Sequence, residues 1–250
     1  MKIVILGSGN VAFHLAKAFF EKKIPVSQIF GRNEKALKEI SINFSIPYST
    51  HELIEADFYL IAVNDDAVAD ISKKITKENC LVAHTSGSLP TEVLAGNYRK
   101  ASFYPLQTFS KSKKLNYAEI PFFVEADNVA DLESLKNLAL EISRNVMISD
   151  YEKRKYIHLT AVFACNFVNH LFARAKEIAV AQNIPFDYFL PLIDETVQKI
   201  HEMEPKSAQT GPAVRNDERV LKLHEALIKD EEPLKIYKTM NESIKKMYEL

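Results

Sequence analysis

The chain has 250 residues, of which 47% are hydrophobic and 26% are charged, a balance typical of a globular protein with one large or two ordinary domains. Its 32 Lys and Arg residues against 33 Asp and Glu give a net charge of −1, so charge offers no case for binding nucleic acid or a membrane surface. The sequence has neither an apolar run of the roughly 18–20 residues that span a bilayer nor a signal-peptide core, so it predicts a cytoplasmic protein. It has no cysteines at metal-ligand spacing and therefore predicts no metal site.

Residues 1–150 alternate short β-rich runs with helical stretches, a pattern typical of a parallel sheet that carries helices on both faces. The sequence therefore predicts an α/β fold over residues 1–150, with a Rossmann-like, doubly wound and mostly parallel sheet. Strands are expected at 2–7, 26–31, 57–63, 80–86, 101–109, 121–126 and 145–149, and helices at 10–23, 33–40, 65–75, 89–96 and 128–144.

The pattern changes after Asp150, and residues 151–250 are expected to form an all-helical domain. Residues 151–183 contain no Gly or Pro, which predicts one helix of about 30 residues, apolar nearly all round at its middle. Such a helix needs cover on several sides, so we expect a homodimer through the helical domain; the alternative is a monomer whose first domain covers the helix. Three shorter helices are expected at about 186–203, 216–230 and 234–248.

The first expected strand ends in a glycine turn, Gly7-x-Gly9-x-x-Ala12, that opens a helix. Gly7 allows the tight turn, Gly9 lets a diphosphate approach the backbone, and Ala12 is small enough for the helix to pack on the strand. The free N–H groups and the positive dipole at the start of the helix also favour phosphate. This context predicts dinucleotide binding, although the motif alone also fits a plain tight turn. The residues expected to contact the dinucleotide here are Gly7, Ser8, Gly9, Asn10 and Val11.

The second expected strand ends in Gly31, Arg32 and Asn33. NAD-binding proteins tend to place Asp or Glu at this position, where it accepts a hydrogen bond from the ribose 2′-hydroxyl. Arg32 cannot accept that bond, but its planar guanidinium suits a 2′-phosphate. We therefore expect NADP(H) as the cofactor, with these three residues around its ribose. The alternative is a solvated arginine at the start of a helix.

Two further strand ends carry candidate residues, since open α/β sheets bind ligands at that edge. Val63 and Asn64 follow one strand and are expected beside the nicotinamide. Thr85 and Ser86 follow the next strand. We expect Thr85 to contact the cofactor and Ser86 to contact the substrate. The alternatives are local: the acidic pair after Asn64 caps a helix, and residues 85–88 form a capped turn.

Six motifs, GSGNVA, GRN, AVNDDAV, HTSGS, YPLQTFS and TGPAVRND, occur in this order. With them the whole chain resembles a family of bacterial proteins assigned as NADP oxidoreductases. More distantly, it is similar to pyrroline-5-carboxylate reductase and to deazaflavin-dependent NADP reductases. The resemblance implies a Rossmann-like domain followed by a helical domain like that of 6-phosphogluconate dehydrogenase-like proteins. It also implies NADP binding, dimerisation through the helical domain and a site in the interdomain cleft, but no particular substrate.

The motif YPLQTFS departs from the family's pattern at Tyr104, where the resemblance leads us to expect histidine. A phenol with an ordinary pKa of about 10 replaces a proton-transferring histidine poorly near neutral pH. Tyr104 is therefore expected to shape the pocket, and the alternative is that it donates a proton. Gln107, in the same motif, is a candidate substrate contact.

The long expected helix carries the candidate catalytic residues His158 and Asn166. Histidine changes charge near neutral pH, and polar side chains in so apolar a helix need partners. Distantly related hydroxyacid dehydrogenases carry Lys and Asn one turn apart on the equivalent helix, and here Val162 stands in place of the lysine. A structural histidine explains His158 equally well.

The segment AQTGPAVRND interrupts the expected helices of the second domain at Gly211. In pyrroline-5-carboxylate reductase the loop at the corresponding place receives the substrate. By that resemblance Thr210, Arg215 and Asp217 are candidate substrate contacts, with Arg215 binding a carboxylate or another anion. The alternatives are helix capping by Asp217 and a simple connection.

Together these features predict an NADP(H)-dependent oxidoreductase that acts on a small, anionic carbonyl or imine compound. The glycine turn, Arg32 and the polar clusters support this hypothesis. The main alternative is a non-catalytic NADP-binding sensor or scaffold dimer, which the missing lysine and Tyr104 favour. A nucleotide-dependent transferase comes third, because the ribose hydroxyls of S-adenosylmethionine prefer an acidic partner to Arg32.

Overall fold

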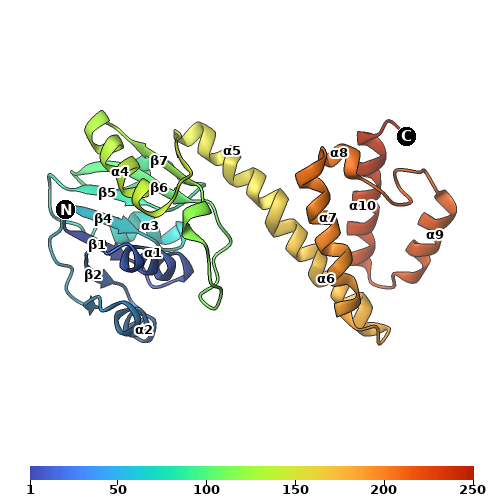
Figure 1. Cartoon of the computed structure of the whole chain (residues 1–250), viewed down its shortest axis with the longest axis horizontal. Coiled ribbons are helices and arrows are strands. Elements are labelled where there is room, and N and C mark those ends of the chain that lie inside the picture. The colour runs from blue at the N-terminus through green and yellow to red at the C-terminus, as the bar shows by residue number, and fades with distance from the viewer. The chain divides into compact units, whose positions relative to one another are not determined.

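The computed structural model describes all 250 residues, and the chain forms two compact units, residues 1–166 and 167–250 (Figure 1). The first unit is an α/β structure built on one sheet. The second contains only helices and their connections. No helix combines the length and the apolar character needed to cross a membrane.

The first unit contains an eight-stranded sheet with the strand order β3-β2-β1-β4-β5-β6-β7-β8. All neighbouring strands are parallel except β6 and β7, which pair antiparallel. The first six strands follow the order 3-2-1-4-5-6 of a Rossmann fold, which confirms the predicted fold class. The strands are β1 Ile3–Leu6, β2 Val26–Phe30, β3 Tyr48–Ser49, β4 Phe58–Ile61, β5 Leu81–His84, β6 Arg99–Pro105, β7 Phe122–Ala126 and β8 Val146–Ile148.

Each face of the sheet carries its own hydrophobic core. Successive residues of β1 point to opposite faces, so Ile3 and Ile5 join one cluster while Val4 and Leu6 join the other. Both faces are therefore covered, as the continuous apolar run of β1 predicts for a parallel strand. The helices of this part are α1 Asn10–Glu21, α2 Glu34–Phe44, α3 Asp65–Ser72 and α4 Val129–Ile142; α1, α2 and α4 pack on the first cluster and α3 on the second.

Two local predictions for the first 150 residues are wrong. Residues 89–96 form only a short 3-10 turn, Thr91–Val93, rather than a helix. Pro90 immediately precedes that turn, and Gly96 has a φ of +156°, so the backbone leaves helical geometry at both ends. The strand expected over 101–109 ends at Pro105.

The long helix predicted from Tyr151 is present, but it is not uniform. It consists of α5 Tyr151–Ala161, a π-helical segment Val162–Phe167 and α6 Val168–Ala181. The Asp150 carboxylate starts α5 by accepting a hydrogen bond from the Lys153 amide at 2.8 Å. Helix α5 belongs to the first compact unit, and the domain limits 1–150 and 151–250 stay a prediction.

The second unit contains the three further helices that the sequence predicts, and one additional turn. The additional turn, α8, begins at a proline, a residue that favours the first position of a helix. The helices are α7 Leu190–Glu202, α8 Pro205–Ala208, α9 Glu218–Leu227 and α10 Glu231–Met247.

Candidate functional site

A cavity of about 1110 Å³ opens at the carboxyl ends of β1, β2 and β4. Strand order reverses between β1 and β4, and Rossmann folds bind their ligands at such a reversal. The structure brings together here every residue predicted to bind the cofactor, except Thr85. The lining residues are Gly7, Ser8, Gly9, Asn10, Val11, Gly31, Arg32, Asn33, Ala62, Val63, Asn64, Asp66, Ala67, Asp70, Ile71 and Lys74.

The glycine turn leaves room for a ligand at the start of α1. At Gly7 the φ is +135°, and a Cβ atom would lie 2.0 Å from the carbonyl oxygen of Ala62, so only glycine fits. At Gly9 a Cβ atom would meet nothing within 4 Å, because that position faces open space. No side chain caps α1, so its first N–H groups are available to an anion. This geometry fits a diphosphate group.

Two cations line the cavity, Arg32 after β2 and Lys74 just beyond α3. Both side chains are exposed. Asn33 caps α2 by accepting a hydrogen bond from the Ala36 amide at 3.1 Å, which fixes the turn beside Arg32. Sequence reasoning missed Lys74, because only the fold shows that the end of α3 faces the same cavity as the end of β2.

Hydroxyl groups form most of the hydrogen bonds in the loop that follows β5. The Oγ of Ser86 accepts hydrogen bonds from the amides of Ser88 and Leu89, at 3.1 and 3.2 Å, and the Ser88 hydroxyl donates to the Asp65 carboxylate. The Thr85 amide donates to the carbonyl of Ile61, at 3.0 Å, which places Thr85 beside β4 rather than in the cavity lining. Residues 85–88 therefore form a capped turn, and no side chain caps α3.

Tyr104 and His158 meet at the same edge of the sheet. In the register of β6 with β5, Ser102 pairs with His84, so Tyr104 lies beyond the last paired residue, level with the loop that follows β5. The Tyr104 hydroxyl lies 3.1 Å from Nδ1 of His158 on α5, within hydrogen-bond distance. Burial raises the pKa of Tyr104 to about 12, so the phenol stays neutral. The two residues thus form a hydrogen-bonded pair that the sequence did not predict.

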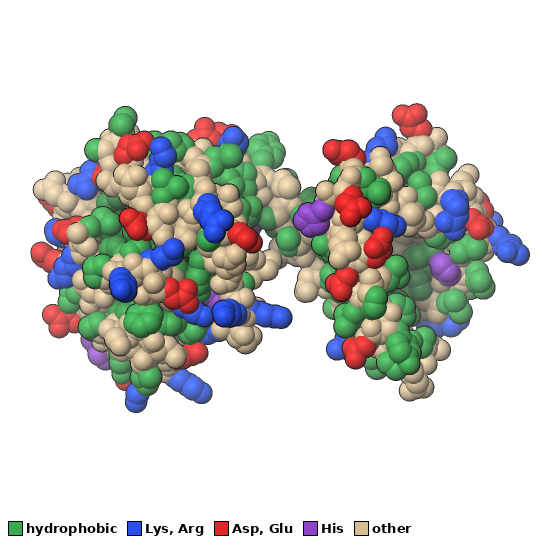
Figure 2. All heavy atoms as spheres, viewed as in Figure 1, with side chains coloured by type: hydrophobic (Ala, Val, Ile, Leu, Met, Phe, Trp, Pro, Cys, Tyr) green, Lys and Arg blue, Asp and Glu red, His purple; other side chains and the backbone are tan.

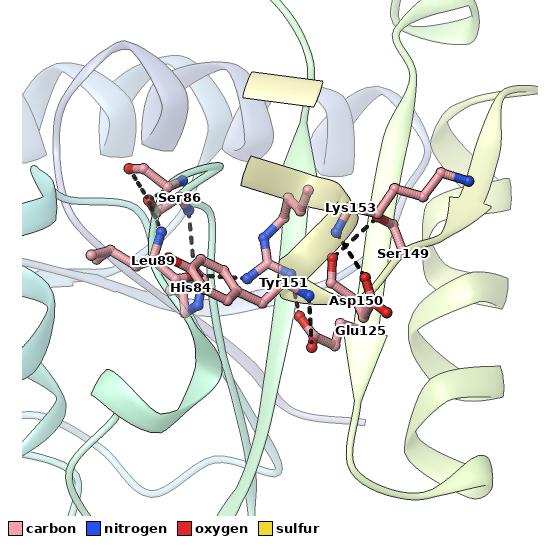
Figure 3. A network of polar contacts seen from close by, with 10 residues as sticks. His84, Ser86, Leu89, Glu125, Ser149, Asp150, Tyr151 and Lys153 are labelled. Atoms are coloured by element: carbon pink, nitrogen blue, oxygen red, sulfur yellow. Dashed lines mark hydrogen bonds and ion pairs between the residues drawn. The ribbon is translucent and has the colours of Figure 1, made fainter. Parts of the chain in front are cut away.

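A buried ionic network beside this pair fixes the start of α5 (Figure 3). Arg154 is 0% exposed, pairs with the carboxylate of Glu125 on β7, and donates to the carbonyl of Leu89 at 2.6 Å. The Tyr151 amide also donates to Glu125, at 3.1 Å. At the end of β5, His84 Nδ1 accepts a hydrogen bond from the Ser86 amide. Burial, together with the charge of Arg154, lowers the pKa of His84 to about 4. His84 is therefore a neutral structural residue near pH 7.

The loop after β6 is tied to the start of α1. Asn10 Nδ2 donates to the carbonyl of Phe109 at 2.9 Å. Buried His14 lies 2.9 Å from the carbonyl of Ser110 and 2.7 Å from the hydroxyl of Tyr117, so Nε2 donates to the carbonyl and Nδ1 accepts from the phenol. Gln107 is exposed, and its Oε1 accepts from the Thr108 amide at 2.7 Å.

The remaining candidates lie elsewhere in the chain. Asn166 is exposed at the end of the first unit, in the π-helical segment. Thr210, Arg215 and Asp217 belong to the second unit, where Thr210 and Arg215 are exposed. Asp217 caps α9 by accepting a hydrogen bond from the Val220 amide at 3.2 Å. A role for these residues near the cofactor cavity stays a prediction.

Comparisons with known proteins agree with the geometry of the cavity. Residues 2–87 match the family described as "NADP oxidoreductase coenzyme F420-dependent", and residues 120–244 match a domain of unknown function, DUF2520. The first match contains the glycine turn, Arg32 and the strand ends at residues 63 and 85. No curated protein matches the chain.

Solved structures cover the whole length of the chain. A Bacteroides fragilis protein assigned as an NADP oxidoreductase is 40% identical, with a TM-score of 0.93, over 100% of this chain and 98% of that one. A Thermotoga maritima protein is 21% identical, with a TM-score of 0.83, over 99% and 100% of the two chains. The 1-pyrroline-5-carboxylate reductase of Streptococcus pyogenes is 14% identical, with a TM-score of 0.62, over 100% and 99%, and shares the fold. The chain belongs to the family of Rossmann-fold NADP oxidoreductase-like proteins that carry a C-terminal DUF2520 domain.

Proposed function

We propose that the protein is an NADP(H)-dependent oxidoreductase that reduces a small, anionic carbonyl or imine compound. The observation that carries this proposal is the cavity at the ends of β1, β2 and β4, which combines the glycine turn, the uncapped start of α1 and Arg32. The membership of the family of NADP oxidoreductase-like proteins supports the same cofactor.

The proposed position of the diphosphate is beside Gly9 at the first turn of α1, and that of the 2′-phosphate is beside Arg32, with Lys74 as the second cation of the cavity lining. An arginine offers a phosphate two parallel hydrogen bonds, and Lys74 adds a second positive charge on the other wall. Asp70, on the same wall, is paired with Lys73 at 2.7 Å, which lowers the pKa of Asp70 and keeps its charge balanced.

The reacting end of the cofactor is directed toward the ends of β5 and β6, because a dinucleotide crosses the sheet edge from the β2 side. Bound NADPH supplies a hydride there. His158 is the proposed proton donor, and Asn166 the second candidate catalytic residue. We propose Ser86, Gln107, Thr210, Arg215 and Asp217 as substrate contacts in the interdomain cleft, and a homodimer through the helical domain.

Titration of the protein with NADPH and NADH, followed by nicotinamide fluorescence, tests the cofactor assignment. We expect NADPH to bind at least about tenfold more tightly than NADH, since a phosphate–arginine contact is worth about 1.5–3 kcal/mol. Arg32→Asp should abolish or reverse that preference, and Lys74→Ala should reduce it. Lys38→Asp, an equal change of charge at an exposed position of α2 outside the cavity lining, is the matched control. Equal binding of both cofactors by the unmodified protein would contradict the proposal.

NADPH oxidation in the presence of small keto acids and cyclic imines tests catalysis. Turnover with one of these classes, lost in His158→Gln, would support the proposed reaction. Tight NADPH binding without turnover across the panel would favour a non-catalytic NADP-binding sensor instead. That alternative is supported by the capped turn, which already engages the Ser86 hydroxyl in local hydrogen bonds.

A further inference from the structure

The contact between Tyr104 and His158 joins two residues from different elements of the first unit. Their Oη and Nδ1 atoms lie 3.1 Å apart, and the two rings meet edge-on, with centroids 6.1 Å apart and planes at 69°. Tyr104 is 8% exposed, whereas His158 is half-buried. The tyrosine is therefore the inner member of the pair and the histidine the outer one.

The loop after β5 presses on both side chains at Gly87. A Cβ atom at that position would lie 2.7 Å from the ring of Tyr104 and 2.9 Å from both Cβ and Nδ1 of His158. Any larger residue would push the two rings apart. The absence of a side chain at Gly87 thus permits the hydrogen bond, and the loop backbone closes the pair on a third side.

The helix that carries His158 is fixed one turn earlier by Arg154. Residues four apart lie on the same face of a helix, so the face that sends Arg154 into the ionic network with Glu125 and Leu89 also turns His158 toward the sheet. A fully buried guanidinium with these partners resists rotation of α5 about its axis. The buried contacts of Arg154 therefore fix the direction in which α5 presents His158.

The hydroxyl group of Tyr104 can keep its hydrogen bond to His158 while the histidine gains or loses a proton. A phenol both donates and accepts hydrogen bonds, so it stays bonded to Nδ1 whether or not that atom carries a proton. A carboxylate in the same place would only accept and would favour the charged ring. The charged groups that act on Tyr104 are Arg154 and Asp65, which have opposite effects on its ionisation.

We propose that Tyr104 is the positioning residue for His158: its hydroxyl holds Nδ1 and leaves Nε2 directed at the substrate as the proton donor of the reduction. This inference rests on the proposed function. When the substrate carbon gains its hydride, the C=O or C=N π bond breaks, the Nε2–H bond of the charged imidazole breaks, and that proton forms the new O–H or N–H bond. His158 is left neutral with its remaining proton on Nδ1, which donates to the Tyr104 oxygen. A proton from the solvent then returns to Nε2, so that the reduction consumes one hydride and one proton overall.

Nitrogen-15 NMR of the full chain labelled at histidine tests this arrangement without a substrate, with His158→Gln used to assign the signals. We expect the Tyr104 hydroxyl to donate to Nδ1 of neutral His158, so that the ring carries its proton on Nε2, and Tyr104→Phe, which keeps the ring and loses the hydroxyl, to shift part of the proton toward Nδ1. Tyr117→Phe is the matched control, because it removes the equivalent hydroxyl beside His14 and should leave the His158 signals unchanged. An identical His158 tautomer in the unmodified protein and in Tyr104→Phe would overturn the inference.

Fluorescence titration with NADPH on the same samples separates this inference from the proposed function. Tyr104→Phe should bind NADPH within about twofold of the unmodified protein, because Tyr104 is not among the residues that line the cofactor cavity. Failure of both proteins to bind NADPH would contradict the proposed function, whereas unchanged tautomers with tight binding would overturn only the role of Tyr104. With a substrate in hand, Tyr104→Phe should lower kcat by about 10–100-fold with little effect on KM; an unchanged kcat would also overturn the inference.

Discussion

Gly7 and Gly9 in the cofactor cavity serve two different purposes, which their surroundings separate. Gly7 has a positive φ and lies against the carbonyl of Ala62, so it is needed for the turn itself. Gly9 has an extended backbone, with φ −78° and ψ −170°, and open space where a side chain would be. The fold therefore does not require glycine at residue 9, whereas an approaching diphosphate does.

Gly9→Val should consequently separate stability from binding. We expect the free energy of unfolding to fall by no more than about 1 kcal/mol, because a Cβ atom at residue 9 would meet nothing within 4 Å and the remaining cost is the poor fit of valine to the start of a helix. The NADPH dissociation constant should rise at least about tenfold, since the valine occupies the proposed diphosphate position. Urea denaturation and fluorescence titration measure the two quantities. Gly7→Ala is the comparison variant and should lower stability itself; a Gly9→Val protein that binds NADPH normally would contradict the placement of the diphosphate.

Buried His84 links the stability of the first unit to pH. Its pKa is about 4 in the folded chain, below the ordinary 6.5, mainly because of burial and then because of the Arg154 charge. Between these values the unfolded chain binds a proton that the folded chain does not, so stability falls as pH drops from 6.5 toward 4. The loss is on the order of 3 kcal/mol at the acid end of this range.

Urea denaturation at a series of pH values checks this prediction. His84→Gln should flatten the slope between pH 6.5 and 4, because glutamine has no proton to bind. His201→Gln, at an exposed histidine of α7, is the control and should leave the slope unchanged. A slope that is the same in the His84→Gln variant would show that His84 is not its source.

Among the elements, α5 is attached to the sheet by a buried ion pair. Arg154 and Glu125 form a buried pair, whereas Lys155 and Glu152, on the same helix, pair at 2.7 Å on its exposed side. Breaking a buried pair leaves an uncompensated charge in a low-dielectric site, which costs far more than losing a solvated pair.

Glu125→Gln should therefore destabilise the protein by about 3–5 kcal/mol, because it leaves the Arg154 guanidinium without its counter-charge. Glu152→Gln, which makes the same chemical change at the exposed pair, should cost at most about 0.5 kcal/mol. Chemical denaturation of both variants supplies the comparison. Equal effects of the two substitutions would contradict the role of the buried pair in holding α5.

Much of the fold could be predicted from local sequence signals. The apolar run of β1, the glycine turn and the uninterrupted segment from Tyr151 specify elements over a few residues each. Contacts between distant segments could not be predicted in this way. Tyr104 and His158 are 54 positions apart, and Lys74 reaches the cavity of Arg32 only because α3 runs along it. Residues 89–96 do not form the predicted helix, because the backbone leaves helical geometry at Pro90 and at Gly96, and the composition of the segment does not reveal this.

In the whole molecule, the two units differ in how much apolar surface they bury. The first unit has two extensive cores, whereas the buried hydrophobic residues of the second are only Ala179, Ala213 and Leu221. Hydrophobic side chains remain visible among the charged ones at the surface of the helical unit (Figure 2). Exposed apolar area of this kind is typical of a surface that a partner covers, which supports the proposed homodimer.

Light scattering coupled to size-exclusion chromatography tests that assembly. We expect a mass of two chains for the unmodified protein, and a mass of one chain for a variant that combines Ile178→Glu with Leu192→Glu, at residues that are 57% and 65% exposed. Ile42→Glu, at a 72% exposed residue of the first unit, should remain a dimer. A single-chain mass for the unmodified protein would contradict dimerisation.

The crystal structure of the protein with bound NADP⁺ tests the central claim most directly. The predicted result places the diphosphate beside Gly9 at the start of α1, the 2′-phosphate in hydrogen-bond contact with the Arg32 guanidinium, and the nicotinamide ring on the side of the sheet edge that carries Tyr104 and His158. A 2′-phosphate that contacts neither Arg32 nor Lys74, or a nicotinamide ring directed away from the ends of β5 and β6, would contradict the account.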